Sequence, residues 1–233
     1  MNNQVRISKR FCGPPDSGNG GYTCGVLSQF VHGDAEVTLI KPPPLDRILT
    51  VEKTDDGIVY LKDGYVIVAK AIPNVLNLET PAPPGFQEAQ SSTPDPALME
   101  SHPFPTCFVC GPQRQEGDGL RIFPGPAEGK SYVATTWIPD LSLGDRDGKV
   151  KEEFIWAALD CPGAWAIFWD KVKVVVLGKL AVQIKRQVKV QDRCILIAWK
   201  ISEQGRKITT GSAVFSEEGD LLAKALATWI ELI

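Results

Sequence analysis

Two short stretches of the sequence could carry chemistry, and the first lies near the N-terminus. Asn19, Gly20 and Gly21 precede a mostly apolar run, residues 22–31, which is predicted to be a helix. The first N–H groups of a helix have no partner inside it and lie at the positive end of its dipole, so they can stabilise an oxyanion. Glycine would also let a substrate approach this backbone closely. Alternatively, the same residues form only a tight turn in which Asn19 caps the helix.

The second stretch contains Asp160, which lies in the most apolar helical segment of the chain, residues 150–169. A carboxylate there is costly unless it is paired or used, and it could deprotonate a water molecule or attack a substrate itself. The bland alternative is a capping role for Asp160 at the segment after Pro162 and Gly163. Proline is expected to kink or end the helix near its middle.

Other groups with metal-binding or acid–base potential are sparse. Cys107 and Cys110 have the spacing of metal ligands. A structural zinc ion needs four ligands, and His102 is the only further candidate nearby, so we expect an apolar turn and no metal. His102 and His32 are expected to be solvated. Neither precedes a motif of dehydratases that pair histidine with an acid, so that class of enzyme is disfavoured. No phosphate-binding loop or dinucleotide fingerprint occurs, so no cofactor is expected.

The composition is that of a globular protein. The chain has 233 residues, 43% apolar and 23% charged, with a formal net charge of −3. Acidic and basic residues are mixed throughout, which argues against nucleic acid or a membrane surface as a partner. No stretch approaches the length of a membrane span, and the first residues lack the apolar core of a signal peptide. We therefore expect a cytoplasmic protein whose six cysteines are reduced thiols.

Periodicity and turn signals predict an α+β protein with two similar halves. Residues 1–73 are predicted to form a weak strand, a glycine- and proline-rich loop, a helix and antiparallel strands; residues 74–106 form a proline-rich linker; residues 107–233 repeat the order. The expected strands after the first helix and in the second half are residues 35–41, 45–53, 57–61, 65–72, 119–123, 130–138, 179–189, 193–202, 207–215 and 221–232.

This order of elements resembles the hotdog fold of acyl-CoA thioesterases and phenylacetate-type thioesterases. Three motifs carry the resemblance: Gly18-Asn19-Gly20-Gly21-Tyr22 at a helix start, Cys107-Phe108-Val109-Cys110-Gly111 followed by Gly119-Leu120-Arg121-Ile122, and Ala157-Ala158-Leu159-Asp160 within a helix. The resemblance covers nearly the whole chain except the linker. It implies two tandem hotdog units, each an antiparallel sheet wrapped around one central helix.

The resemblance also implies a function and a site. The protein would be an acyl-CoA thioesterase-like hydrolase acting on acyl-CoA or another acyl thioester, and it would form a homodimer. Asp160 would be the base or nucleophile, and Asn19, Gly20 and Gly21 would provide the oxyanion donors from the other half. The equivalent partner site, between Ser28 and residues 151–153, would lack both parts. Four further residues are expected to bind the substrate: Tyr22, Gln183, Lys185 and Arg186.

Departures from the family's pattern leave a second class of function open. Double-hotdog enzymes add a threonine and a glutamine from later strands. Here Ala227 occupies the glutamine position, and the strand that contains Gln183 has no threonine. A non-catalytic hotdog protein that binds acyl thioesters or acts as an interaction scaffold is therefore the alternative. Lys185 and Arg186 could meet the phosphates of CoA or could lie on a solvated sheet edge.

Overall fold

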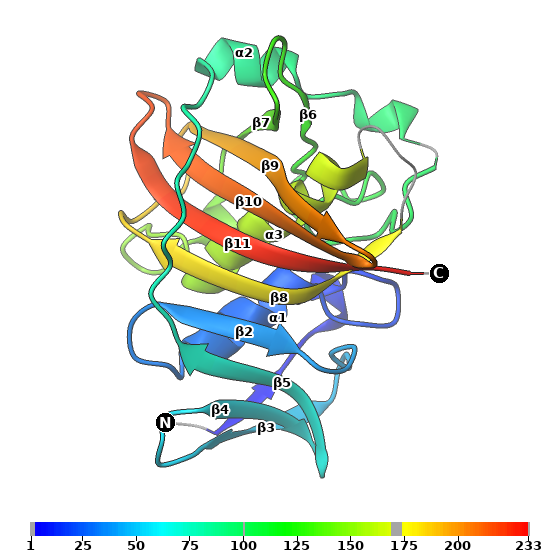
Figure 1. Ribbon diagram of the computed structural model, residues 1–233, viewed down its shortest axis with the longest axis vertical. Helices are drawn as coiled ribbons and strands as arrows, with labels where there is room; N and C mark the ends of the chain where they lie inside the picture. The colour runs from blue at the N-terminus through cyan, green and yellow to red at the C-terminus, as the bar shows by residue number, and fades with distance from the viewer. Residues whose placement is uncertain (1–2, 100, 169–173, 233) are drawn as a thin grey trace.

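All the strands of the computed structural model, which describes residues 3–99, 101–168 and 174–232, belong to one antiparallel sheet. Its eleven strands run in the order β1-β3-β4-β5-β2-β8-β11-β10-β9-β7-β6 (Figure 1). The strands are β1 (Gln4–Arg6), β2 (Ala35–Leu39), β3 (Ile48–Lys53), β4 (Val59–Asp63), β5 (Val66–Pro73), β6 (Gly125–Pro126), β7 (Val133–Trp137), β8 (Val175–Ile184), β9 (Cys194–Gln204), β10 (Lys207–Ser216) and β11 (Leu221–Glu231).

Two helices pack on the concave face of this sheet. These two are α1 (Gly20–Ser28) and α3 (Glu152–Phe168). The described residues also form the helix α2 (Phe86–Ser91) and three short 3-10 turns, η1 (Lys9–Phe11), η2 (Pro96–Leu98) and η3 (Leu141–Leu143). The sheet curves around α1 and α3, and α2 lies apart at one end (Figure 1). α1 contacts β2, β5 and β8, whereas α3 contacts β9, β10 and β11. The strands from the first part of the chain therefore lie on one side of the sheet and those from the second part on the other.

The two sides meet where β2 pairs with β8, between Ala35↔Val182 and Thr38↔Lys179. Buried and exposed residues alternate along strands such as β3 and β4, because one face of each strand is apolar and packs toward the helices. A single main core cluster includes residues from both sides.

The helices touch each other through glycines of α1. A Cβ atom on Gly21 would lie 2.4 Å from the Cβ of Asp160, and one on Gly25 would lie 2.6 Å from the Cα of Glu153. Residue numbers fall along α3 as they rise along α1, so the two helices run antiparallel. The start of α1 consequently faces the middle of α3, and the end of α1 faces the start of α3.

Two sequence predictions need correction, and part of a third falls outside the described residues. Residues 119–123 form no strand; Arg121 has a positive φ of 53°, and the segment is held by hydrogen bonds from Leu120 and Ile122 to the turn that contains Phe108 and Val109. The α3 helix continues through Pro162, because its flanks are buried and Gly163 packs closely on Thr210 and Trp229. The predicted helix reached Trp169, which lies outside the described residues.

The proline-rich segment crosses the face of the sheet opposite the helices (Figure 1). Lys224 Nζ on β11 donates a hydrogen bond to the carbonyl of Leu78 at 2.6 Å, and the Tyr132 hydroxyl donates to the carbonyl of Ala82 at 3.1 Å. The segment also includes α2, which the sequence did not predict. α2 buries Phe86 and Ala89 in a second apolar cluster beside β7. Within the described ranges, no helix combines the length and apolar character that crossing a bilayer requires.

Candidate functional site

The start of α1 is organised by the side chain of Asn19. This residue is the N-cap: its Oδ1 accepts a hydrogen bond from the backbone N–H of Tyr22 at 2.8 Å. Its backbone carbonyl accepts from the hydroxyl of Thr23 at 2.8 Å. Asn19 is only 2% exposed, so its second side-chain group, the Nδ2 amide, must find a partner inside the protein.

That partner is the carboxylate of Asp160. Asp160 Oδ2 accepts hydrogen bonds from Asn19 Nδ2 at 3.1 Å and from the backbone N–H of Gly21 at 2.8 Å. Its other oxygen, Oδ1, is buried and has no hydrogen-bond partner. The structure therefore brings together all four residues that the sequence suggested for catalysis, and it leaves one carboxylate oxygen available for a further proton or ligand.

Burial decides the protonation behaviour of Asp160. Loss of hydration raises its pKa to about 7, partly opposed by the hydrogen bond from the Gly21 amide. The neighbouring Cys107 raises the pKa further, and the Asn19 amide lowers it. A carboxyl group with a pKa near neutrality can exchange a proton with a reacting group at physiological pH.

Asp160 and Asn19 line an apolar pocket of about 560 Å³. Its walls come from the start of α1, the middle of α3, the ends of β2, β8 and β11, and residues 102–104 of the proline-rich segment. Large apolar side chains dominate these walls; they include Leu39, Phe104, Trp165, Leu177 and Trp229. A carboxylate among such groups suits a ligand with a hydrocarbon part and one polar reacting group.

The two glycines lie in tight contact with neighbouring side chains. Gly21 leaves no space for a substrate at its Cα, because a Cβ there would collide with Asp160. Its N–H is also already bound to the carboxylate. A Cβ on Gly20 would lie 2.8 Å from a methyl group of Leu177. Both glycines therefore permit close packing, and the first N–H of α1, on Gly20, is the remaining candidate for an oxyanion donor.

The four residues predicted to bind the substrate lie outside this pocket. Tyr22 stacks on Phe11, with ring centroids 4.1 Å apart, in an aromatic cluster of the core. Gln183 donates to Asp34 at 2.8 Å. Arg186 pairs with Asp220 on the surface at 2.7 Å, and Lys185 is exposed beside it. The first residues of β8 line the pocket, whereas Gln183, Lys185 and Arg186 lie at or just after the other end of this strand.

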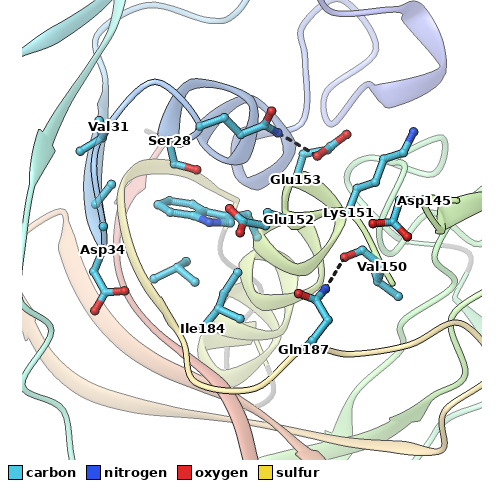
Figure 2. Close-up of a pocket in the computed structure, with 15 residues that line it drawn as sticks. Ser28, Val31, Asp34, Asp145, Val150, Lys151, Glu152, Glu153, Ile184 and Gln187 are labelled. Atoms are coloured by element: carbon cyan, nitrogen blue, oxygen red, sulfur yellow. Dashed lines mark hydrogen bonds between the residues drawn. The ribbon is translucent and has the colours of Figure 1, made fainter. Parts of the chain in front are cut away.

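A second pocket, of about 700 Å³, lies where the end of α1 meets the start of α3 (Figure 2). Ser28 and residues 151–153 line it, as the expected partner site requires. The pocket is polar and acidic, with Asp34 and Asp145 on opposite sides of the view in Figure 2. The side-chain amide of Gln29 donates to Glu153 Oε2 at 2.8 Å across the helix contact.

Sequence reasoning missed most of the residues around Asp160. His102 was expected to be solvated, but it is half-buried, contacts Trp165 at 5.7 Å between ring centroids, and lines the apolar pocket. His32 is exposed, as expected. Cys161 lies beside Cys107 and Cys110, although it is far from both in sequence. In the sequence, the position of Cys161 next to Asp160 was the one indication that this cysteine lies near the site.

Comparisons with known proteins agree with this architecture. No protein-family model and no curated protein matches the sequence. Solved structures do match. One is a tesB protein from Mycobacterium avium subs paratuberculosis, which is 14% identical in sequence; the match covers 93% of this chain and 88% of that chain, with a TM-score of 0.61. A thioesterase described as putative from Novosphingobium aromaticivorans has 12% identity, 97% and 94% coverage and a TM-score of 0.61.

A third match is described as a conserved protein with hot dog fold from Alicyclobacillus acidocaldarius, with 9% identity, 99% and 92% coverage and a TM-score of 0.57. The chain has a hotdog fold. The resemblance to hotdog thioesterases inferred from the sequence is thereby confirmed for the fold. At these identities the comparisons leave the activity and the roles of individual residues as predictions.

Proposed function

We propose that the protein is an acyl thioester hydrolase built from two fused hotdog units, residues 1–73 and 107–233. The observation that carries the proposal is the environment of Asp160: a buried carboxyl group with one unpartnered oxygen, in an apolar pocket, bonded to the N-terminus of a helix from the other unit. A thioester offers what this site can use: an acyl chain for the apolar walls and a carbonyl carbon open to attack. The thioesterase names of the structural neighbours add support.

In the proposed reaction, Asp160 first accepts a proton and later gives it back. Asp160 Oδ1 would take a proton from a water molecule as the water oxygen bonds to the thioester carbon. The carbonyl oxygen becomes an oxyanion, which the N–H of Gly20 and the positive end of α1 would stabilise. Cleavage of the carbon–sulfur bond then releases a thiolate, and Asp160 returns the proton to it. The alternative is direct attack of the carboxylate to form an anhydride.

A single-turnover reaction in ¹⁸O-labelled water distinguishes the two routes. If Asp160 is the base, the label appears in the released fatty acid in the first turnover. If Asp160 is the nucleophile and water attacks the Asp160 carboxyl carbon of the anhydride, the first turnover releases unlabelled acid and leaves the label in the Asp160 carboxyl group. Mass spectrometry of the acid and of the peptide that contains Asp160 gives the answer. Absence of turnover on every acyl-CoA from short to long chain would contradict the proposal.

A second candidate is a protein that binds acyl thioesters without cleaving them. The observation that favours it is the engagement of the Gly21 N–H by Asp160, which leaves fewer donors for an oxyanion. Calorimetric titration with a non-hydrolysable acyl-CoA analogue, alongside chromatographic measurement of released CoA, separates the two. Tight binding with no CoA release supports the binding protein; release that depends on Asp160 supports the hydrolase.

The assembly expected from the sequence is also part of the proposal. We propose that the chain forms a homodimer, as its resemblance to hotdog proteins implies. Sedimentation equilibrium tests this: a mass near twice the 25.4 kDa of one chain supports the dimer.

A further inference from the structure

We propose that Cys107, Cys110 and Cys161 form a binding site for a thiophilic divalent metal ion, with Zn²⁺ as the expected occupant. All three side chains are buried, and their Sγ atoms lie within 4.8 Å of one another. The Sγ atoms of Cys107 and Cys161 are 3.7 Å apart. The sequence shows only the Cys107–Cys110 pair, and the α3 helix supplies the third sulfur from another part of the chain.

The sulfur spacing fits a metal ion. Zinc–thiolate bonds are about 2.3 Å long, so two sulfurs at a tetrahedral angle lie about 3.8 Å apart. The Cys107–Cys161 separation matches this value without rearrangement of either side chain. A disulfide would need the same two sulfurs at about 2.05 Å.

The turn that holds Cys107 also holds Cys110, and it keeps their two sulfurs within 4.8 Å of each other. Gly111 closes the turn with an N–H donated to the carbonyl of Cys107 at 2.9 Å. A Cβ on Gly111 would lie 2.5 Å from that carbonyl oxygen, so the tight turn requires glycine there.

Asn19 adds an outer layer to the cluster. Its Nδ2 lies 3.9 Å from the Cys107 sulfur and 3.8 Å from the Cys161 sulfur, within the range of N–H···S hydrogen bonds. Such bonds orient metal-bound thiolates and reduce their negative charge.

Binding of a divalent ion by three thiolates releases the cysteine S–H protons to solvent. Among the described residues, no other cysteine, histidine or carboxylate joins the group. All three cysteines line the apolar pocket, so the fourth coordination position is open to a water molecule.

Metal titration of the whole, reduced protein tests the site without reference to catalysis. After removal of metal by a chelator, Zn²⁺ is titrated in competition with a chromophoric chelator, and Co²⁺ is used as a spectroscopic substitute. We expect one tightly bound Zn²⁺ per chain and a sulfur-to-cobalt charge-transfer band. Cys161→Ala and Cys107→Ala should weaken Zn²⁺ binding by more than about tenfold, since even loss of an outer-layer partner has that effect.

The matched control is Cys194→Ala, which removes a buried cysteine outside the cluster. It should leave the stoichiometry and the cobalt spectrum unchanged. Because a variant could fail to fold, Cys110→Ser serves as a second test, and circular dichroism checks each protein. No stoichiometric Zn²⁺ binding by protein with six titratable thiols, or undiminished binding by folded Cys161→Ala, would overturn the proposal. A protein without hydrolase activity could still pass this test.

Discussion

The two pockets lie at equivalent places in the molecule and differ in almost everything else. Each is formed where the start of α1 or of α3 meets the other helix. Counted from the first residue of its helix, Asp160 in α3 and Ser28 in α1 occupy the same position. The first pocket combines this carboxyl group with a capped, glycine-containing helix start and apolar walls. The second has a serine opposite Lys151, Glu152 and Glu153, and its walls are polar.

The difference shows how one architecture can hold two environments. In the first pocket, the apolar walls remove water from a carboxyl group and raise its pKa to about 7. In the second, carboxylates face a cavity that water can enter, and Glu153 is paired with Gln29. The antiparallel contact of α1 and α3 is common to both. Chemistry therefore depends on which side chains occupy the helix ends, not on the fold alone.

The largest expected effect comes from replacing the carboxyl group at one end of the contact. Asp160→Asn should lower kcat for acyl-CoA hydrolysis by about 10²–10⁴-fold, because it removes the general base. Glu153→Gln, in the second pocket, should leave kcat within about twofold. Chromatography of released CoA measures both, and it avoids thiol reagents that react with the protein. Equal losses in the two variants would break the assignment of chemistry to the first pocket.

The next largest effect is expected at the two glycines of α1 that contact α3, Gly21 beside the first pocket and Gly25 farther along the helix. Gly21→Ala and Gly25→Ala each place a methyl group in the α1–α3 contact, and each should destabilise the fold by about 1–3 kcal/mol. Thermal unfolding should show similar losses. Only Gly21→Ala should also reduce the hydrolysis rate of the folded protein, because its new Cβ displaces Asp160. Unchanged activity in folded Gly21→Ala would mean that this contact does not position the carboxyl group.

A pH series tests the electrostatic difference. The folded pKa of Asp160 is raised from 3.8 to about 7, so the folded state holds a proton that the unfolded state has lost between these values. Stability should therefore fall as the pH rises through this window and should level off above pH 7. Between pH 5 and pH 7 the loss is about 2 kcal/mol relative to Asp160→Asn.

Chemical denaturation of both proteins in the presence of a chelator, to keep bound metal from contributing, measures this difference. Glu153→Gln provides the comparison from the second pocket. A constant difference between wild type and Asp160→Asn across this pH range would show that Asp160 is ionised in the folded protein.

The smallest expected effect concerns the apolar walls. Ala164 lies one helical turn after Asp160 and lines the first pocket. Ala164→Leu should narrow the pocket and lower kcat/KM for long acyl chains relative to short ones by about tenfold, since one methylene is worth about 1–3 kcal/mol. Val31→Phe, in the second pocket, should leave the chain-length profile unchanged. A shift caused by Val31→Phe instead would place the acyl chain in the second pocket.

Local patterns were sufficient for much of the fold. The hairpin strands β9, β10 and β11 follow from alternating apolar residues between short turns, and their bounds agree with the prediction within two residues. Residues 119–123 were misjudged because Leu120, Ile122 and Phe123 fill the core from an irregular segment, in which the positive φ of Arg121 interrupts any strand. Pro162 was misjudged because packing around Gly163 maintains the helix despite one lost hydrogen bond.

The sequence by itself determined which residues could act: a carboxyl group in an apolar helix, a helix start with an asparagine cap, and a pair of closely spaced cysteines. These features are local, so composition and spacing reveal them. Only the tertiary structure decided which of them meet. The antiparallel contact of α1 and α3 brings Asp160 to Gly21, and packing of the turn at residues 107–110 on α3 brings Cys107 to Cys161. Gln183 and Arg186 lie outside the pocket. Distances between residues remote in sequence are set by packing, which local patterns do not encode.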